Sequence, residues 1–268
     1  VVSFTVAAIC TIIPALRLGR IADLSVTLRQ GGRSGTAGRS QHRLRGAMVA
    51  FQVALALVVL AGSGLLLRTF QRLHAVEPGF TADHVATFWM SLPAARYTSD
   101  TSIVRFYSAL QEQVSALPGV RNAGLTSRLP LMGHGMNQNP FYSEDDAEAG
   151  NRIPPLQIYT TIDASYFKVM GIPLLAGRGF DRFESQRDFE AIISQRTAEQ
   201  FWKDPTGKAA LGKRFRGLPS GPWYTVIGVV GNTRDTALAA PPSQTIYFPE
   251  IVSGDTVNSQ VARTMALV

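Results

Sequence analysis

The hydrophobic and polar positions divide the chain into one long apolar run and a series of short elements. The apolar run covers residues 46–67, a stretch of 22 residues without a formal charge between Arg45 and Arg68. A helix of this length is about 30 Å long, which is the thickness of the hydrocarbon core of a bilayer. Only Gln52 and Ser63 interrupt its apolar surface, whereas a buried helix of a soluble protein usually has a polar face. The run therefore predicts a transmembrane helix, with a buried helix as the alternative.

Beyond Arg68 the pattern is that of an α+β domain built from short elements. The helix is expected to continue until Pro78 and Gly79 stop it. Residues 84–92 alternate like a strand, residues 100–117 carry one apolar stripe typical of a helix, and residues 120–125 form a second strand, which together predict a β-α-β unit. A loop-rich stretch at 126–151 is followed by expected strands at 158–162, 173–175, 191–194, 223–230, 245–248 and 265–268 and by expected helices at 166–170 and 196–202.

The residues before the apolar run predict a membrane-associated segment. Residues 1–13 are apolar but too few to span a bilayer, so we interpret residues 1–16 as the end of a preceding transmembrane helix. Residues 17–45 form a basic linker, in which residues 21–30 have the stripe of a short amphipathic helix for the inner membrane surface or for a cytosolic partner. We expect both ends of the sequence to be artificial.

The distribution of charge predicts the orientation of the helix. The formal net charge is +7, and residues 17–45 hold seven Arg and one Asp, which accounts for +6 of it. Basic residues resist translocation, so the side before residue 46 is expected to be cytoplasmic and residues 70–268 to be periplasmic. A basic segment next to a membrane helix explains the charge better than nucleic-acid binding does. Cys10 is the single cysteine, which excludes an intramolecular disulfide and a zinc site built on cysteines.

Part of the apolar run is suited to contact with another helix. Gly46, Ala50 and Ala54 recur at four-residue spacing and leave a smooth face that a second helix can approach closely. The amide of Gln52 would be costly against lipid tails. We therefore predict that Gly46, Ala50, Gln52 and Ala54 pack against other transmembrane helices, although a lone helix is possible.

The motif that looks most like a binding site is the glycine- and lysine-rich segment 207–213, GKAALGK. It fits the first part of a phosphate-binding loop, but Arg214 stands where the Ser or Thr that holds magnesium would be, and the preceding residues do not form a buried strand. A turn leading into a strand is the better interpretation. If ATP is used, we expect another chain to bind it.

Other candidate sites have simpler explanations. His134 lies between two glycines but has no neighbouring nucleophile or carboxylate at a diagnostic spacing. The acidic residues at 144–148 lack the pattern of a calcium loop and are typical of a solvated loop. The glycines of segment 171–179 fit tight turns. We predict no catalytic, cofactor-binding or metal-binding residue, and hence no enzyme.

Several segments together resemble the MacB-type (MacB/FtsX-like) ABC transporter permease family, and within it the duplicated orphan permeases known from acidobacteria. The segments are LRGAMVAFQVALALVVLAGSGLLLRTFQRL (44–73), VEPGFTADHVATFWMSLP (76–93), RFYSALQEQVSALPGV (105–120), IDASYFKVMGIPLLAGRGF (162–180), DPTGKAALGKRF (204–215) and VIGVVGNTRD (226–235). The turn in TGKAALGKRF is longer than is usual in the family, and we expect it to alter only a loop.

The resemblance implies a transmembrane helix at 46–69 and a MacB-like periplasmic core domain at 70–268. The domain would have a porter-like β-α-β part at about 80–128 and 220–268, interrupted by a smaller α+β insertion at about 129–219. It also implies a permease in the bacterial inner membrane whose partner is a separate cytosolic ABC ATPase, with export or transmission of force as the result. The alternatives are a membrane-tethered module that senses an extracytoplasmic ligand and, more remotely, a membrane-anchored hydrolase.

Overall fold

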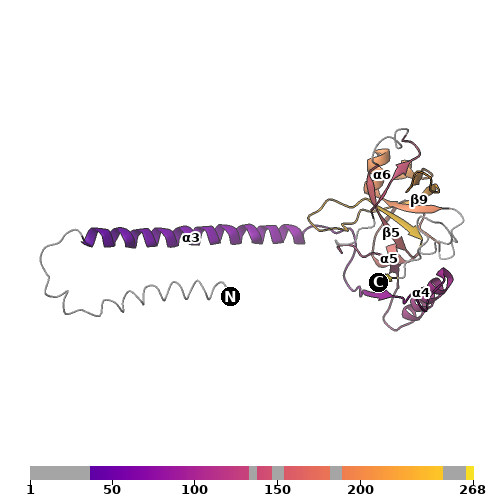
Figure 1. Cartoon of the computed structure of the whole chain (residues 1–268), viewed down its shortest axis with the longest axis horizontal. Coiled ribbons are helices and arrows are strands. Elements are labelled where there is room, and N and C mark those ends of the chain that lie inside the picture. The colour runs from indigo at the N-terminus through magenta and orange to yellow at the C-terminus, as the bar shows by residue number, and fades with distance from the viewer. Residues whose placement is uncertain (1–36, 133–137, 147–153, 182–188, 250–263) are drawn as a thin grey trace. The chain divides into compact units, whose positions relative to one another are not determined.

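The computed structural model describes residues 37–132, 138–146, 154–181, 189–249 and 264–268 (Figure 1). The chain divides into two compact units, Val1–Phe70 and Gln71–Val268, and each is described by itself. The expected helix end at 1–16 and the amphipathic segment at 21–30 lie outside the described residues.

The first described element is α3, a helix of 38 residues from Ala37 to His74. It contains the whole apolar run, so the predicted helix is confirmed, but its bounds differ from the prediction. It begins in the expected linker, because residues 37–45 contain no Pro or helix-ending Gly pair and extend the same helix. It ends four residues before Pro78. Its last turn contains Arg72 and His74, and basic side chains near the carbonyl end stabilise a helix.

The C-terminal unit is built on one mixed sheet of eleven strands. Its main path is β1-β11-β2-β5-β10-β7-β9-β8-β4, with β3 paired to β5 and β6 paired to β9. The strands are β1 Phe88–Ser91, β2 Leu125–Thr126, β3 Gln138–Pro140, β4 Tyr142–Ser143, β5 Leu156–Ile162, β6 Leu174–Gly177, β7 Glu190–Ser194, β8 Arg214–Arg216, β9 Tyr224–Val230, β10 Thr245–Pro249 and β11 Thr264–Leu267. The helices are α4 Asp100–Ser115, α5 Tyr166–Val169, α6 Gln195–Trp202 and the 3₁₀ turn η1 Lys208–Ala210.

The predicted β-α-β unit is present, with one strand added to it. β1 and β2 both pair antiparallel with β11, so they run parallel to each other with β11 between them. The Ser99 side chain caps α4 by accepting a hydrogen bond from Ser102 N–H (3.3 Å), and α4 buries Ile103 and Tyr107 against β2 and β11. The strand predicted at 120–125 is wrong except at Leu125, because residues 120–124 connect α4 to the sheet.

The other half of the sheet alternates parallel and antiparallel pairs. β5 is parallel to β10, β10 is antiparallel to β7, and β7 is parallel to β9. β9 and β10, from the expected porter-like part, thus pair with β7 and β5 of the expected insertion. The division into a porter-like part and an insertion stays a prediction. α4 and α6 lie at opposite ends of the unit (Figure 1).

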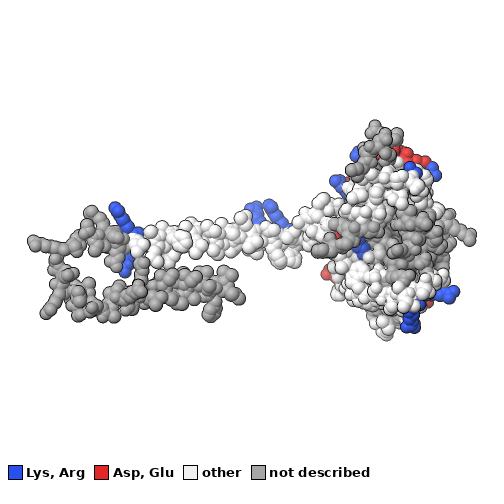
Figure 2. Space-filling view, in the orientation of Figure 1, with Lys and Arg blue, Asp and Glu red and all other residues white. Residues whose placement is uncertain are grey.

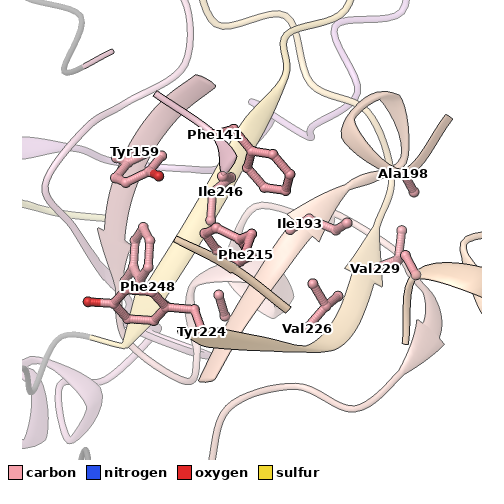
Figure 3. Close-up of a cluster of buried hydrophobic side chains, with 12 residues drawn as sticks. Phe141, Tyr159, Ile193, Ala198, Phe215, Tyr224, Val226, Val229, Ile246 and Phe248 are labelled. Carbon is pink, nitrogen blue, oxygen red and sulfur yellow. The ribbon is translucent and has the colours of Figure 1, made fainter. Parts of the chain in front are cut away.

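An aromatic core fills one face of this second half. The ring of Phe215, on β8, stacks on Phe141 at a centroid distance of 4.6 Å and also contacts Tyr224 and Phe248 (Figure 3). Phe141 lies between β3 and β4, in the region predicted to be loop-rich. These two short strands form there because the aromatic side chain between them is buried.

Candidate functional site

The helix α3 is long and apolar enough to cross a membrane. Its candidate span runs over residues 43–74, and the most apolar part of this span is not buried at all. In Figure 2 the helix is uncharged between two groups of basic residues. An exposed apolar surface of this length costs free energy in water and favours lipid. Thr69, just beyond Arg68, satisfies its hydroxyl within the helix by donating to Leu65 O (2.9 Å).

The four residues predicted to pack against other helices all lie on α3. Gly46, Ala50, Gln52 and Ala54 are exposed, and a Cβ added at Gly46 would meet no atom within 4 Å. Within the described part of the chain no second helix covers them. Their role in helix packing stays a prediction.

The phosphate-loop-like segment 207–213 folds as a turn leading into β8, as predicted. Its backbone N–H groups already have acceptors: Ala209 N–H donates to the carboxylate of Asp204 (2.8 Å), and Gly212 N–H donates to Val226 O (2.8 Å). The same carboxylate also accepts a hydrogen bond from Thr206 N–H (2.8 Å), just before the segment. The bond from Ala209, followed by the bonds from Thr206, holds the pKa of Asp204 below its ordinary value. A phosphate would have to displace a carboxylate that belongs to the turn.

We therefore expect the chain, freed of any partner ATPase, to show no saturable ATP binding at millimolar concentration in equilibrium dialysis. Lys213→Ala should behave as the wild type does, because Lys213 pairs with Asp145 (3.0 Å) on the exposed surface. Saturable binding that Lys213→Ala abolishes would show that the segment holds phosphate.

The acidic residues and the basic turn are partners of each other. Glu144 pairs with Arg214, and Asp145 pairs with Lys213 and accepts a hydrogen bond from Trp202 Nε1 (2.9 Å). The bond from Arg214 lowers the pKa of Glu144, and the bond from Lys213 lowers that of Asp145. The acidic residues therefore belong to a surface ion-pair cluster rather than to an isolated loop.

The remaining sequence candidates add no chemistry. His134 and Glu148 lie outside the described residues, and among the residues that are described no group of three His, Cys, Asp or Glu could hold a metal ion. Gly171 has a positive φ of 65°, as expected of a glycine in a tight turn, whereas Gly177, with a φ of 74°, ends strand β6 and lies close to Ile227 O of the neighbouring strand. The site that the structure does define lies where the chain leaves α3.

The chain leaves α3 through residues 75–81, which we call the neck. Its first two residues continue the hydrogen bonding of the helix, since Ala75 N–H donates to Gln71 O (3.1 Å) and Val76 N–H to Leu73 O (3.3 Å). Pro78 then fixes a backbone dihedral. The neck is therefore ordered from the last turn of the helix onward.

The loop after β9 holds the next neck residues through Arg234. The backbone N–H of Arg234 donates to Pro78 O (3.0 Å), and its Nε donates to Glu77 O (3.4 Å). The Nη1 of the same guanidinium donates to Ala240 O, on the far side of the loop. One side chain thus joins the neck to both arms of the loop.

Two glycines allow the backbones to approach closely. Gly79 has a φ of +85°, and a Cβ there would overlap the carbonyl oxygen of Asn232; at Gly171 a Cβ would lie 2.6 Å from Thr81 Oγ1. Thr81 N–H donates to Met170 O (2.8 Å). We call the residues that contact the neck the neck seat: Met170, Gly171, Asn232, Thr233 and Arg234. Its hydrogen bonds to the neck all go to the neck's main chain.

Asn232 anchors the neck seat on the middle of the sheet. Its Oδ1 accepts a hydrogen bond from Arg196 N–H (2.6 Å) in the first turn of α6, and its Nδ2 donates to Gln195 Oε1 (3.1 Å). The loop is closed by Ser243 N–H, which donates to Thr233 O (2.8 Å). Because α6 follows β7 and the loop joins β9 to β10, the neck seat is fixed to three adjacent strands.

A buried carboxylate, Asp163, joins the two halves of the C-terminal unit. Its Oδ1 accepts from Leu125 N–H (2.7 Å), and its Oδ2 accepts from Gln111 Nε2 (2.5 Å) and Ser165 N–H (2.9 Å). Asp163 is 8% exposed. Burial raises its pKa above the ordinary value, although the hydrogen bonds from Leu125, Ser165 and Gln111 favour the charged form.

The chain thus combines a helix long and apolar enough to cross a membrane with a sheet-rich α+β unit. The chain belongs to the family of MacB-like periplasmic core domains, whose profile matches residues 53–266. The MacB-type resemblance and the α+β fold class are therefore confirmed. Members are components of ABC transporter permeases, which are not themselves enzymes. The acidobacterial duplication stays a prediction.

Solved structures that are similar to this chain include the following three. A domain described as a permease protein from Porphyromonas gingivalis has 21% identity and a TM-score of 0.37, and covers 60% of this chain and 64% of its own. The periplasmic region of MacB from Actinobacillus actinomycetemcomitans has 14% identity and a TM-score of 0.42. The match covers 70% of this chain and 75% of the MacB region. The extracellular domain of the noncanonic ABC-type transporter YknZ from Gram-positive bacteria has 14% identity and a TM-score of 0.42. The match covers 68% of this chain and 83% of the YknZ domain. No curated protein matched the chain.

Sequence reasoning missed the neck seat and Asp163. The segments VEPGF and VGNTRD carried the family resemblance, but nothing in either segment indicated that the two contact each other. A signal was available at Pro78-Gly79, because a proline followed by a glycine favours a turn in which the glycine has a positive φ.

Proposed function

We propose that this chain is part of the permease subunit of an ABC-type transporter in the bacterial inner membrane. A separate cytosolic ATPase hydrolyses ATP and thereby moves the periplasmic unit, residues 70–268, for export or for transmission of force across the envelope. The observation that carries the proposal is the exposed and uncharged stretch 46–67 of α3 in a chain whose residues 53–266 match the MacB-like periplasmic core domain.

The lack of charged residues in stretch 46–67 supports transmission of force through the helix rather than conduction of a substrate along it. Charged residues within membrane segments usually mark ion or substrate pathways, and residues 46–67 have none. The long continuous helix is suited to transmit displacement because its backbone is hydrogen-bonded throughout.

The orientation can be tested with single cysteines. With Cys10 replaced by Ser, we expect a cysteine at Ser40 to react with a membrane-impermeant maleimide only after the cells are lysed, and a cysteine at Thr98 to react in cells with a permeabilised outer membrane. Labelling of both positions from the same side would contradict the proposed topology.

The partner can be tested by purifying the full-length protein in mild detergent and assaying ATP hydrolysis. We expect a cytosolic ABC ATPase to co-purify, and its turnover to change when Ala50 is replaced by Leu, because a larger side chain prevents close helix approach. Leu57→Ile, on the same helix, is the matched apolar control and should leave turnover unchanged. Absence of any ATPase would refute the proposed function.

A further inference from the structure

We infer that the outer face of the β8–β9 hairpin carries a binding site for a carboxylate, formed by Tyr142, Arg216 and Trp223, and that its occupant is an acidic side chain of a partner protein. We call these three residues the carboxylate site. The inference goes beyond the proposed function, because it concerns a surface of the C-terminal unit that takes no part in ATP hydrolysis. Only the compartment in which a partner meets this surface follows from the proposed orientation.

The alternation of side chains along β8 places Arg216 on the outer face of the sheet. Its neighbour Phe215 points into the aromatic core (Figure 3), so Arg216 points away from that core. Arg216 pairs in register with Tyr142 of β4, and its Cζ lies 4.7 Å from the centroid of the Trp223 ring, directly before β9. An aromatic residue therefore flanks the guanidinium on each side of β8.

All three side chains carry hydrogen-bond donors that have no acceptor among the described residues. The Nε of Arg216 is enclosed without a partner, and the phenol O–H of Tyr142 and the indole N–H of Trp223 donate to no described residue. The enclosed Nε and the ring contact restrict the guanidinium, and Nη1 and Nη2 are left to bind an acceptor end-on. A planar guanidinium held in this way matches the two oxygens of a carboxylate.

The adjacent ion-pair cluster shows which acceptor such donors take in this protein. Arg214 donates from Nε to Glu144 Oε2 (2.8 Å), and Trp202 donates from its indole N–H to Asp145 Oδ2 (2.9 Å). Both acceptors are carboxylates of the same chain. The carboxylate site repeats the combination of an arginine and a tryptophan, but no Asp or Glu of the described residues pairs with its arginine. We therefore expect the carboxylate to come from another molecule.

The surroundings of the carboxylate site favour a single acidic side chain on a protein. Glu144 and Asp145 lie close by in the sequence of the same surface, and their charges would repel an array of phosphates such as a lipid surface presents. Leu218, in the loop between β8 and β9, is 40% exposed and offers an apolar contact beside the site. Trp, Tyr and Arg are also the residue types that contribute most of the binding energy at protein interfaces.

The test uses the purified full-length protein in a neutral detergent, labelled with fluorotryptophan and titrated with the blocked peptide acetyl-Gly-Glu-Leu-amide. Fluorine NMR follows the signal of Trp223, which is assigned by its loss in Trp223→Phe. We expect this signal to shift and to saturate at about millimolar peptide, because a single charge-assisted pair binds weakly. The signal of Trp202 should stay in place, since its indole N–H already has an acceptor. The same peptide with Gln in place of Glu should leave both signals unchanged.

Two substitutions of Arg216 separate binding from folding. Arg216→Lys keeps the charge and the aliphatic stem but lacks the planar fork, so it should weaken binding of the Glu peptide about tenfold. Arg216→Glu should abolish that binding and reverse the preference toward acetyl-Gly-Lys-Leu-amide. Arg196→Ala is the matched control, because it removes only an exposed ion pair with Glu199 on α6 and should leave the affinity unchanged.

The inference is overturned if the Trp223 signal shows no saturable shift with the Glu peptide, or if Arg216→Glu binds this peptide as the wild type does. Tighter binding of inorganic phosphate, or of phosphatidylglycerol vesicles, than of the Glu peptide would assign the surface to phosphate or to lipid and would also overturn it. The titration needs no ATPase. If an ATPase co-purifies and the Trp223 signal does not respond, the inference alone fails; if the signal responds and no ATPase co-purifies, the proposed function alone fails.

Discussion

Replacing Gly79 with Ala is expected to lower the free energy of unfolding of the C-terminal unit by about 3 kcal/mol. Gly79 has a φ of +85°, which is strained for any residue with a Cβ, and the added Cβ would overlap the carbonyl oxygen of Asn232. That oxygen belongs to main chain fixed by α6, so it cannot move aside as a flexible side chain would. The measurement is denaturant unfolding of the full-length protein in detergent, followed by tryptophan fluorescence.

Gly119→Ala is the matched control. Gly119 has a similar φ of +90°, but a Cβ there would meet no atom within 4 Å, so its substitution isolates the backbone strain from the clash. We expect a loss of only about 1 kcal/mol for Gly119→Ala. Equal losses at the two positions would show that Gly79 is required for its dihedral angle alone and that the neck is not closely seated.

Replacing Asp163 with Asn is expected to cost about 2 kcal/mol, because an amide cannot satisfy the three donors around this position. Leu125 N–H points at one oxygen, and Gln111 Nε2 and Ser165 N–H point at the other. In either orientation the amide NH₂ would face at least one of these donors. Asp145→Asn, an equivalent change on the exposed surface, should cost less, because solvent screens that ion pair.

The pH dependence of the difference in stability between the wild type and Asp163→Asn provides a second measurement. Burial raises the pKa of Asp163 in the folded protein above its value in the unfolded chain, so folding favours the protonated form. As pH rises from the ordinary aspartate pKa through the raised one, the wild type loses this contribution to stability and the Asn variant does not. The stability advantage of the wild type should therefore be larger at pH 4 than at pH 7, and a larger advantage at pH 7 would contradict the argument.

The sequence predicted most elements because their signals are local. The uncharged run at 46–67 and the capped stripe of α4 each depend on neighbouring residues. The run lies wholly within α3, and α4 ends two residues before its predicted end. The turn at 207–213 was recognised because Arg214 broke the phosphate-loop pattern. Such features need no knowledge of distant parts of the chain.

The features that were missed all depend on long-range contacts. Glu144 and Arg214 are 70 residues apart, and Glu77 and Arg234 are 157 apart, so the sequence around either partner carries no record of the other. The neighbours of β9 and β10 are likewise set by strand pairing, which hydrophobic patterning does not specify. The division into a porter-like part and an insertion came from the family resemblance and stays a prediction.

The position of β11 determines the order in which the protein can fold during synthesis. β11 fills the space between β1 and β2, and its Thr264 bonds to Ser91 across a separation of 173 residues. Until the ribosome has delivered β11, the strands on either side of it have open edges, and open edges readily pair with other chains. Closure by so distant a strand is slow, so the nascent protein should depend on chaperones longer than a helical protein of equal size would.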